Sequence, residues 1–426
     1  MTARQARAKL PHDAAKDTFA ASGAAKVNNT GTMPSSGTSS GAVSNAVPDI
    51  VDVAIVGAGP VGLLLALRLL QCGLQVTLLE KQTQVSQHSR AIGVHPPTLE
   101  RLAEIGLADK LIARGVRVQQ GVAASDGRVL GALDLSRTAK PFNFVLSVPQ
   151  FETEALLLSA LQQLDAGIVQ RGSEAVAVEQ HADYVRLHYH QAGSSHTLQA
   201  RYVVACDGKH SRIRQAAGIA FVGAAYPDSY LMADVADDSA LGDAAYIDLA
   251  RDGLVESFPL PGAVRRWVVK TPQFQQQARL EPLRQWVAER SGYQLAAQSS
   301  MLSSFGVQRF VAERLLQGRI ILAGDAAHVL SPIGGQGMNL GMMDAWQLAS
   351  SLEQAFAQPS RAAAVLEDYQ HRRRRAAFQA IRRAEFNMVM GRRCPVPRAR
   401  VALVKLLLRP TWQPLLTAMF TMRGLP

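Results

Sequence analysis

The sequence of 426 residues has few cysteines and no long apolar run. Its three cysteines, Cys72, Cys206 and Cys394, are widely spaced and form no Cys-x-x-Cys or Cys/His pattern. This distribution argues against a disulfide framework and a structural metal site, and it favours inert thiols in a reducing cytoplasm. No stretch of eighteen apolar residues occurs, so we expect no transmembrane helix.

Signatures of several other protein classes are missing as well. We find no Ser/His/Asp arrangement for hydrolysis, no metal-ligand cluster and no nucleic-acid-binding motif. Residues 1–48 lack the apolar segment of a secretory signal and are rich in small and polar residues, which predicts a disordered tail. A transit peptide is the alternative, and Asp13 and Asp17 count against it.

Positive charge is concentrated near the C-terminus. The formal net charge is +11, and twelve Lys or Arg between His371 and Arg409, against the single acid Glu385, account for all of it. A solvated helix face is the simplest explanation of such a segment. Apolar stretches at 401–408 and 415–420 interleave with the arginines, so peripheral contact with a membrane is the alternative.

Near-continuous apolar runs at 51–56, 74–80, 201–207 and 319–323 predict strands of a parallel sheet covered on both faces. Because these runs are far apart, we predict an α/β fold: a Rossmann-like nucleotide-binding domain, an inserted mixed or antiparallel-sheet substrate domain, and C-terminal helices. The expected segments are 49–114, 150–218 and 308–358 for the first domain, 115–149 and 219–307 for the second, and 359–426 for the helical region.

The first apolar run leads into Gly57-Ala58-Gly59-Pro60-Val61-Gly62, and Glu80 ends the next run. This is the dinucleotide-binding fingerprint between a strand and a helix. Gly57 permits the tight turn, Gly59 lets the backbone approach a pyrophosphate, and Gly62 lets helix and strand pack closely. The helix N-terminus favours phosphate charge, and Glu80 suits the adenosine ribose hydroxyls. The fingerprint alone fits FAD and NAD equally.

Two later stretches separate these cofactors: "CDGKHSRIR" at 206–214 and "GDAAHVLSPIGGQGMN" at 324–339. Together with the fingerprint, and in this order, they resemble the FAD-dependent aromatic hydroxylases. These are single-component flavoprotein monooxygenases similar to para-hydroxybenzoate hydroxylase and the ubiquinone-pathway hydroxylases. The resemblance covers about residues 51–390 and implies that the first domain binds FAD.

The resemblance implies a set of cofactor-binding positions. Asp325 would bind a ribityl or ribose hydroxyl, and Pro332 would lie beside the isoalloxazine ring. The backbone of residues 335–339, at a helix N-terminus, would face the flavin N1–O2 edge, where reduced flavin carries negative charge. The full predicted set is Gly57, Ala58, Gly59, Pro60, Val61, Gly62, Glu80, Lys81, Arg90, Gln150, Asp207, Gly324, Asp325, Pro332, Gly335, Gln336, Gly337, Met338 and Asn339.

Several of these side chains also have a purely structural interpretation. Asp325 would be a helix N-cap and Asp207 a turn acid. Arg90 would be a surface charge, and Gln150 would cap the helix that follows. We interpret His328, within the third stretch, as structural rather than as a catalytic base.

No substrate-activating residue is recognisable, so the catalytic residues stay unassigned and no metal is expected. Arg265 and Arg266 would suit an acidic substrate group, but we favour exposed charges at a strand edge. Arg214 is expected to support its own loop. The candidate walls of the substrate pocket are strands around 228–236, 243–250 and 254–271.

The resemblance also implies the chemistry. NADPH or NADH would reduce FAD, O2 would add to give a C4a-hydroperoxyflavin, and one oxygen atom would pass to an electron-rich aromatic ring. No second GxGxxG occurs, so the nicotinamide nucleotide is expected to bind transiently. The chain resembles the compact family members, which favours a hydrophobic aromatic, polyketide-like or quinone-like substrate. The alternatives are an FAD-dependent reductase, oxidase or epoxidase on a lipophilic substrate, and a flavin-binding module whose redox state controls a partner.

Overall fold

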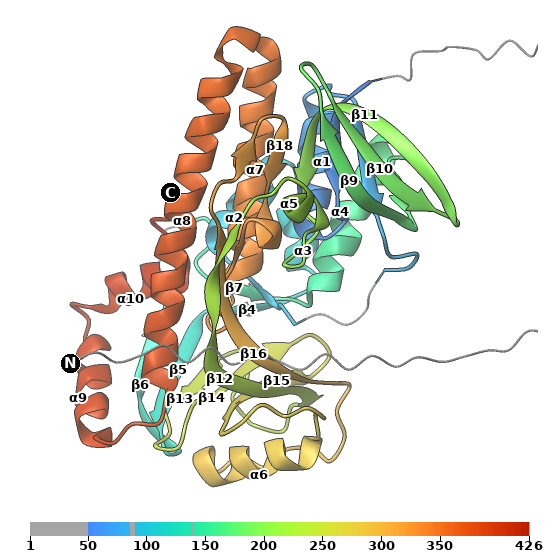
Figure 1. Ribbon diagram of the computed structural model, residues 1–426. Coiled ribbons are helices and arrows are strands. Elements are labelled where there is room, and N and C mark those ends of the chain that lie inside the picture. Colours follow the sequence, from blue (N-terminus) through green and yellow to red (C-terminus); the bar gives the residue numbers. More distant parts are fainter. Residues whose placement is uncertain (1–49, 86–89, 138–139, 426) are drawn as a thin grey trace, which may run out of the picture. The chain divides into compact units, whose positions relative to one another are not determined.

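A mainly parallel sheet carries the dinucleotide-binding fingerprint and the two later cofactor stretches (Figure 1). The computed structural model describes residues 50–85, 90–137 and 140–425, so the predicted tail at 1–48 lies outside the described residues. The strand order is β17-β18-β11-β1-β2-β8, and a hairpin of β9 and β10 extends from β11. The strands are β1 Val51–Val56, β2 Val76–Glu80, β8 Val169–Arg171, β9 Ser173–Gln180, β10 Val185–Gln191, β11 Ser194–Ala205, β17 Leu316–Gln317 and β18 Ile320–Leu322.

The central strands are parallel and come from distant parts of the chain. Strand β1 pairs with β2 on one side and with β11 on the other, and β11 pairs with β18. The carboxyl ends of β1, β11 and β18 therefore lie at one edge of the sheet, where ligands bind in open α/β sheets. The fingerprint, the 206–214 stretch and the 324–339 stretch each begin where one of these strands ends.

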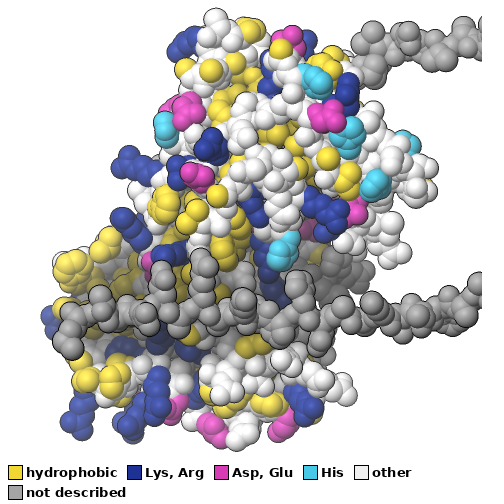
Figure 2. All heavy atoms as spheres, in the orientation of Figure 1, with side chains coloured by type: hydrophobic (Ala, Val, Ile, Leu, Met, Phe, Trp, Pro, Cys, Tyr) yellow, Lys and Arg dark blue, Asp and Glu magenta, His cyan; other side chains and the backbone are white. Residues whose placement is uncertain are grey.

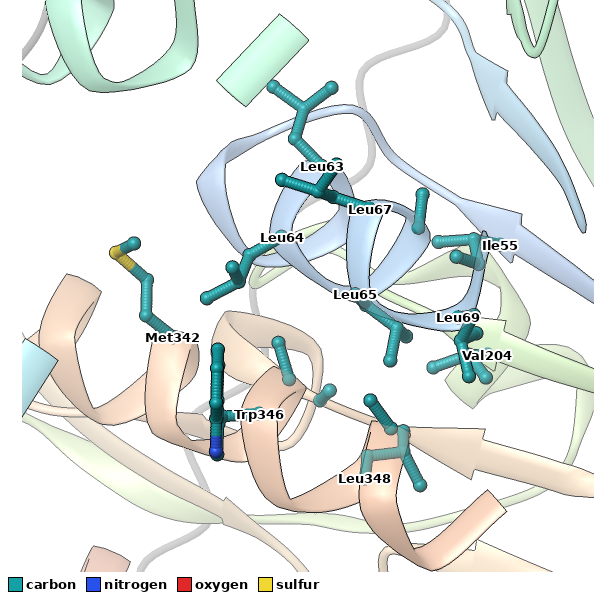
Figure 3. Close-up of a cluster of buried hydrophobic side chains, with 14 of the residues drawn as sticks. Ile55, Leu63, Leu64, Leu65, Leu67, Leu69, Val204, Met342, Trp346 and Leu348 are labelled. Atoms are coloured by element: carbon teal, nitrogen blue, oxygen red, sulfur yellow. The ribbon is translucent and has the colours of Figure 1, made fainter. Parts of the chain in front are cut away.

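Helices α1 (Pro60–Gln71) and α7 (Gln336–Ala357) pack against each other and the sheet. Figure 3 shows leucines of α1 between Ile55 and Val204 of the sheet and Met342 and Trp346 of α7. Five consecutive or near-consecutive leucines of α1, at positions 63, 64, 65, 67 and 69, are at most 2% exposed. Each buried leucine contributes about 1.5–3 kcal/mol, so this layer fixes the position of both helix N-termini.

A second, mostly antiparallel sheet has the order β19-β16-β12-β15-β14-β13-β5-β6. One of its faces is covered by α6 (Leu280–Ser291), which packs on a cluster containing Tyr246, Val255 and Trp267. Its strands are β5 Gln120–Ser125, β6 Arg128–Asp134, β12 Phe221–Ala236, β13 Ala245–Asp248, β14 Val255–Leu260, β15 Val264–Thr271, β16 Met301–Ala312 and β19 His328–Val329.

The remaining elements connect and cover the two sheets. A small sheet is formed by β3 Gly93–Val94, β7 Val145–Ser147 and β4 Val116–Val118. The other helices are α2 Pro96–Glu104, α3 Ala108–Ile112, α4 Gln150–Leu164, α5 Arg212–Ala216, α8 Ala362–Gly391, α9 Pro397–Leu407 and α10 Gln413–Phe420. Among the described residues, no helix combines the length and the apolar character that crossing a bilayer requires.

The predicted fold class is confirmed: a parallel α/β layer, an inserted mixed sheet that is mostly antiparallel, and C-terminal helices are all present. The domain boundaries stay a prediction. The one placed between residues 307 and 308 falls inside β16, a continuous strand of the second sheet.

Candidate functional site

The fingerprint loop makes a tight turn directly after β1. Gly57 has a φ of +103°, which favours glycine, and its N–H donates to the Leu79 carbonyl oxygen at 2.8 Å. Glu80 secures the turn from the neighbouring strand. Its two carboxylate oxygens accept hydrogen bonds from the N–H groups of Ala58 and Gln82, each at 2.8 Å. Glu80 therefore shapes the loop in addition to the ribose contact that we predicted for it.

The three fingerprint glycines differ in what surrounds them. A Cβ added at Gly62 would lie 1.9 Å from the carbonyl oxygen of Gly57, and one added at Gly57 would lie 2.4 Å from the carbonyl oxygen of Cys206. A Cβ added at Gly59 would meet no atom of the described chain within 4 Å. Two glycines are thus required by protein packing, whereas Gly59 faces open space at the N-terminus of α1.

The 206–214 stretch lies beside the fingerprint. One carboxylate oxygen of Asp207 accepts the N–H of Ile213 at 3.3 Å, and the other is buried with no partner among the described residues. Burial raises the pKa of Asp207. Arg214 is 4% exposed, and its guanidinium donates to the carbonyl oxygens of Lys209 and Ala326, each at 2.9 Å. The expectation that Arg214 supports its loop is confirmed, and Arg214 also ties that loop to the third stretch.

Asp325 directly follows Gly324, which lies beside the fingerprint helix. The neighbouring Gly324 packs on it, because a Cβ at Gly324 would lie 3.0 Å from a methyl group of Val61. The Asp325 side chain is solvent-accessible, yet burial by the surrounding protein raises its pKa. No hydrogen bond to this carboxylate is found among the described residues, and the N-cap of α7 is Gly335. The N-cap interpretation of Asp325 is therefore wrong.

The N-terminus of α7 carries several polar groups that have no partner within the helix. Gly335 is the N-cap, so the first N–H groups of the helix have no acceptor within it. Gln336 is fully buried, and both polar atoms of its amide lack a partner among the described residues. Pro332 is exposed, whereas Ile333 next to it is buried against the second sheet.

Asn339 clamps this helix to the loop that precedes α2. Its amide oxygen accepts the His95 N–H at 2.8 Å, and its amide nitrogen donates to the carbonyl oxygens of Gly93 at 2.8 Å and Gly335 at 3.1 Å. Burial lowers the pKa of His95 to about 4, so its imidazole is neutral at pH 7. Both polar atoms of the Asn339 side chain are hydrogen-bonded to the protein, so only its backbone is available to a ligand.

A buried charge network that the sequence did not reveal supports the third stretch. Asp344, fully buried on α7, accepts the Gly324 N–H at 3.0 Å and pairs at 2.6 Å with both His328 and Arg373. Burial would raise the pKa of Asp344, but the pairs with His328 and Arg373 more than offset this and hold it below its usual value. His328 is 1% exposed, which supports its structural interpretation. The only sequence signal for Asp344 was a lone acid on an apolar helix face.

Three other predicted positions come from separate parts of the chain. Arg90 is exposed, and its carbonyl oxygen accepts the Arg266 guanidinium at 2.5 Å. Gln150 begins α4 and donates to Glu154 at 2.7 Å, so its side chain does not cap the helix. Lys81 is exposed beside the end of β2 and lines an open hollow of about 450 Å³.

The expectation of exposed strand-edge arginines at 265 and 266 is wrong. Arg265 is fully buried and donates to Asp237 at 2.9 Å. Arg266 is 3% exposed and forms a two-point pair with Asp234 at 2.6 and 2.7 Å. Residue 266 lies on a central strand with neighbours on both sides, so cross-strand pairing rather than solvent determines its surroundings.

These features fit FAD. The open space at Gly59 and the N-terminus of α1 suit a pyrophosphate, and Glu80 lies at the end of the neighbouring strand. The unpartnered Asp325 carboxylate suits a sugar or ribityl hydroxyl, and the free N–H groups of α7 suit the anionic edge of a reduced ring. The three stretches lie in direct contact, since Gly57 reaches Cys206 and Val61 reaches Gly324.

Known proteins are similar to this chain in sequence and fold. The family described as "FAD binding domain" matches residues 50–384. The chain is 35% identical over 310 residues to 6-methylpretetramide 4-monooxygenase of Streptomyces rimosus, covering 70% of this chain and 55% of that protein. It is 33% identical to rifampicin monooxygenase of Streptomyces venezuelae, covering 71% of this chain and 64% of the relative. The chain thus spans less than two thirds of the length of these relatives.

Solved structures agree with this assignment. Anhydrotetracycline hydroxylase from Streptomyces rimosus superposes with a TM-score of 0.74 at 30% identity, covering 88% of this chain and 76% of that one. p-Nitrophenol 4-monooxygenase from Pseudomonas putida superposes with a TM-score of 0.80 at 25% identity, covering 88% and 99%. The predicted resemblance is confirmed, and the chain belongs to the FAD-binding family that includes the flavin-dependent aromatic monooxygenases, with FAD as its cofactor.

Proposed function

We propose that the protein is a single-component FAD monooxygenase that uses NADH or NADPH and O2 to hydroxylate an aromatic or polyketide-like substrate. The observation that carries this proposal is the meeting of three cofactor stretches at one sheet edge, opposite a largely apolar face of a second sheet. The names of the relatives support it, because they are monooxygenases of 6-methylpretetramide, rifampicin and pentachlorophenol.

We infer the following roles for the chain. The backbone from Gly57 to Gly62 and the α1 N-terminus hold the pyrophosphate, and Glu80, with Lys81 and Arg90 nearby, holds the adenosine side. Asp325 holds a ribityl hydroxyl. Residues 335–339 present backbone N–H groups to the ring, and Gln150 and Asp207 border the cofactor. Bound FAD supplies hydride acceptance and oxygen activation, and the protein orients the substrate and excludes water.

The substrate is proposed to lie between the 331–335 loop and the second sheet. Ile333 of this loop packs in a cluster with Val268 and Phe305 of that sheet. The inserted segments 115–149 and 219–307 would then form the substrate domain. Because the face is largely apolar, we infer a lipophilic aromatic substrate.

Flavin content and substrate-dependent turnover test the proposal. The purified protein is expected to be yellow with a flavin spectrum, and an aromatic substrate is expected to stimulate NADPH oxidation. Turnover under ¹⁸O2 should place one labelled oxygen atom in the product. A flavin-bound protein whose substrate conversion continues without O2 would instead support the reductase alternative, and turnover that yields peroxide with no oxygen in the product would support an oxidase.

A second proposal concerns the C-terminal helices, which we infer contact an anionic membrane surface reversibly while the protein is otherwise cytoplasmic. Large apolar side chains at Leu403, Leu406, Trp412 and Leu415 are 41–61% exposed. Exposed basic residues lie among them, and Figure 2 shows hydrophobic and basic side chains mixed over α9 and α10. Burial of apolar area together with attraction to anionic lipid is the mode of interfacial helices.

Vesicle sedimentation tests this contact. We expect co-sedimentation with vesicles containing phosphatidylserine, weaker binding to phosphatidylcholine alone, and loss of binding in a Leu406→Ser/Trp412→Ser variant that retains FAD. Equal recovery in the supernatant with and without anionic vesicles would reject the proposal.

A further inference from the structure

Strand β14 carries a buried carboxylate without a partner. Glu256 is 7% exposed, and it makes no hydrogen bond or ion pair among the described residues. Burial raises its pKa to about 7. An isolated buried carboxylate is costly, and buried polar groups in folded proteins are almost always paired. A group of this kind is therefore a candidate for contact with a ligand.

Register places Glu256 on the face of the second sheet that looks toward the cofactor motifs. Glu256 pairs across the strands with Val268 and stands beside Ile247. Val268 and Ile247 belong to the apolar cluster that contains Ile333, which lies in the glycine-rich loop before α7. The adjacent Val255 points to the other face, which α6 covers.

A second unpartnered polar group lies in the same cluster. The hydroxyl of Tyr230 is buried with no partner among the described residues, and its ring stacks on Phe305 with centroids 5.6 Å apart. Burial and, next, the negative charge of Glu256 raise the pKa of Tyr230. Strand register places the carboxylate and the hydroxyl on the same face of the sheet, and neither has a hydrogen-bond partner among the described residues.

The charged groups on the strands beside Glu256 are already paired, and Arg400 of α9 donates to the backbone carbonyl oxygens of Leu249 and Ala250 at 2.6 and 2.9 Å. Arg266 is held by Asp234, with distances of 2.6 and 2.7 Å. Lys270 lies 3.2 Å from Asp228, whose carboxylate also binds Arg392 at 2.6 Å. No cation therefore neutralises Glu256 from these strands, and no free cation on them would hold a substrate carboxylate. This face suits a ligand that brings a hydrogen-bond donor and no negative charge.

We propose that Glu256, assisted by the Tyr230 hydroxyl, is the polar end of the substrate pocket and accepts the proton of a phenolic or enolic hydroxyl on the substrate. The inference rests on the proposed hydroxylase function and narrows its substrate class to hydroxyl-bearing, uncharged aromatics. In the step, the O–H bond breaks, its proton passes to a carboxylate oxygen, and the electron pair stays on the substrate oxygen. Delocalised into the ring, that pair raises the electron density of the carbon that receives the oxygen atom.

The test compares Glu256→Gln with wild-type holoenzyme, and Glu313→Gln, an exposed glutamate with no side-chain contact among the described residues, is the matched control. The probes are a series of phenols and polyphenols, each paired with its methyl ether. We expect Glu256→Gln to lower kcat/KM for the phenols about 100-fold. Flavin content should stay at the wild-type level, and the methyl ethers should be poor substrates of every variant.

A stability measurement checks the unpaired state of the carboxylate without turnover. The folded pKa of Glu256 lies above its usual value of 4.5, so the folded protein loses stability as pH rises from about 4.5 to 7. Glu256→Gln should therefore raise the melting temperature by about 3 °C at pH 8 and change it little at pH 4. Tyr230→Phe should fold normally and raise KM for the phenols.

The outcomes separate the two levels of inference. If phenols stimulate NADPH oxidation by the wild type and by Glu256→Gln equally, the hydroxylase function stands and the role of Glu256 is overturned. A lower melting temperature of Glu256→Gln at pH 8 would also overturn it, because it would reveal a structural partner. If no aromatic probe stimulates the flavin-loaded wild type, the hydroxylase proposal and the Glu256 assignment fail together.

Discussion

Replacing Asp344 by Asn tests whether the buried network beneath the third stretch holds the cofactor site. The substitution keeps the shape of the side chain and removes its charge. It leaves Arg373, 1% exposed, and His328 without the carboxylate that each of them contacts at 2.6 Å. Breaking a buried ion pair from one side costs about 3–5 kcal/mol, because the remaining charge stays buried without its counter-ion. We expect a loss of that size in the free energy of unfolding.

Urea unfolding followed by tryptophan fluorescence and circular dichroism measures this loss. The control is Asp368→Asn, which breaks an ion pair of 2.7 Å between Asp368 and Arg372 on the surface of α8. An exposed pair contributes about 0–1 kcal/mol, so the control should unfold almost as the wild type does. A double variant with Arg373→Met should lose less than the sum of the two single variants, because the partners act on each other.

The same substitution should weaken FAD retention and change the pH dependence of stability. Asp344 fixes the Gly324 N–H, next to Asp325, so its loss loosens the loop at the cofactor. The folded pKa of Asp344 lies below its usual value of 3.8, so its stabilisation is present above that value and disappears as pH falls through the folded pKa. The difference in the free energy of unfolding between the variant and the wild type should therefore disappear at acidic pH. A loss below about 1 kcal/mol in the free energy of unfolding at pH 7 would show that the Asp344 pairs do not stabilise the fold as a buried network should.

Four further changes separate cofactor binding from folding. Flavin absorbance reports cofactor binding, and thermal unfolding of the apoprotein reports folding. Gly59→Val should abolish FAD retention and leave the stability of the apoprotein unchanged, because the new side chain enters open space. Gly62→Ala should destabilise the apoprotein itself, because the new Cβ would lie 1.9 Å from a carbonyl oxygen. Asp325→Ala should release FAD with little effect on the apoprotein, and full occupancy would contradict its role. Arg266→Met should cost about 3–5 kcal/mol by leaving a buried aspartate unpaired, and unchanged unfolding would argue against that pair.

The local parts of the cofactor site could be predicted from short stretches of sequence. Turn geometry, strand period and helix start depend on neighbouring residues, so the fingerprint, the end of β2 at Glu80 and the start of α7 at Gln336 could be predicted from short stretches. The order of the three stretches then indicated the cofactor. This reasoning works because a backbone site for a phosphate or a flat ring is built from contiguous residues.

Which charges are buried and paired depends on contacts between residues that are distant in sequence. Asp344 meets His328 and Arg373 across distances of 16 and 29 positions, and Arg266 meets Asp234 across 32. Local pattern does not encode such pairs, because strand register and helix packing bring them together and remove water from them. The same register leaves Glu256 buried and without a partner on the sheet face toward the cofactor loop. Neither the residue type of Glu256 nor its neighbours in sequence would have indicated this burial.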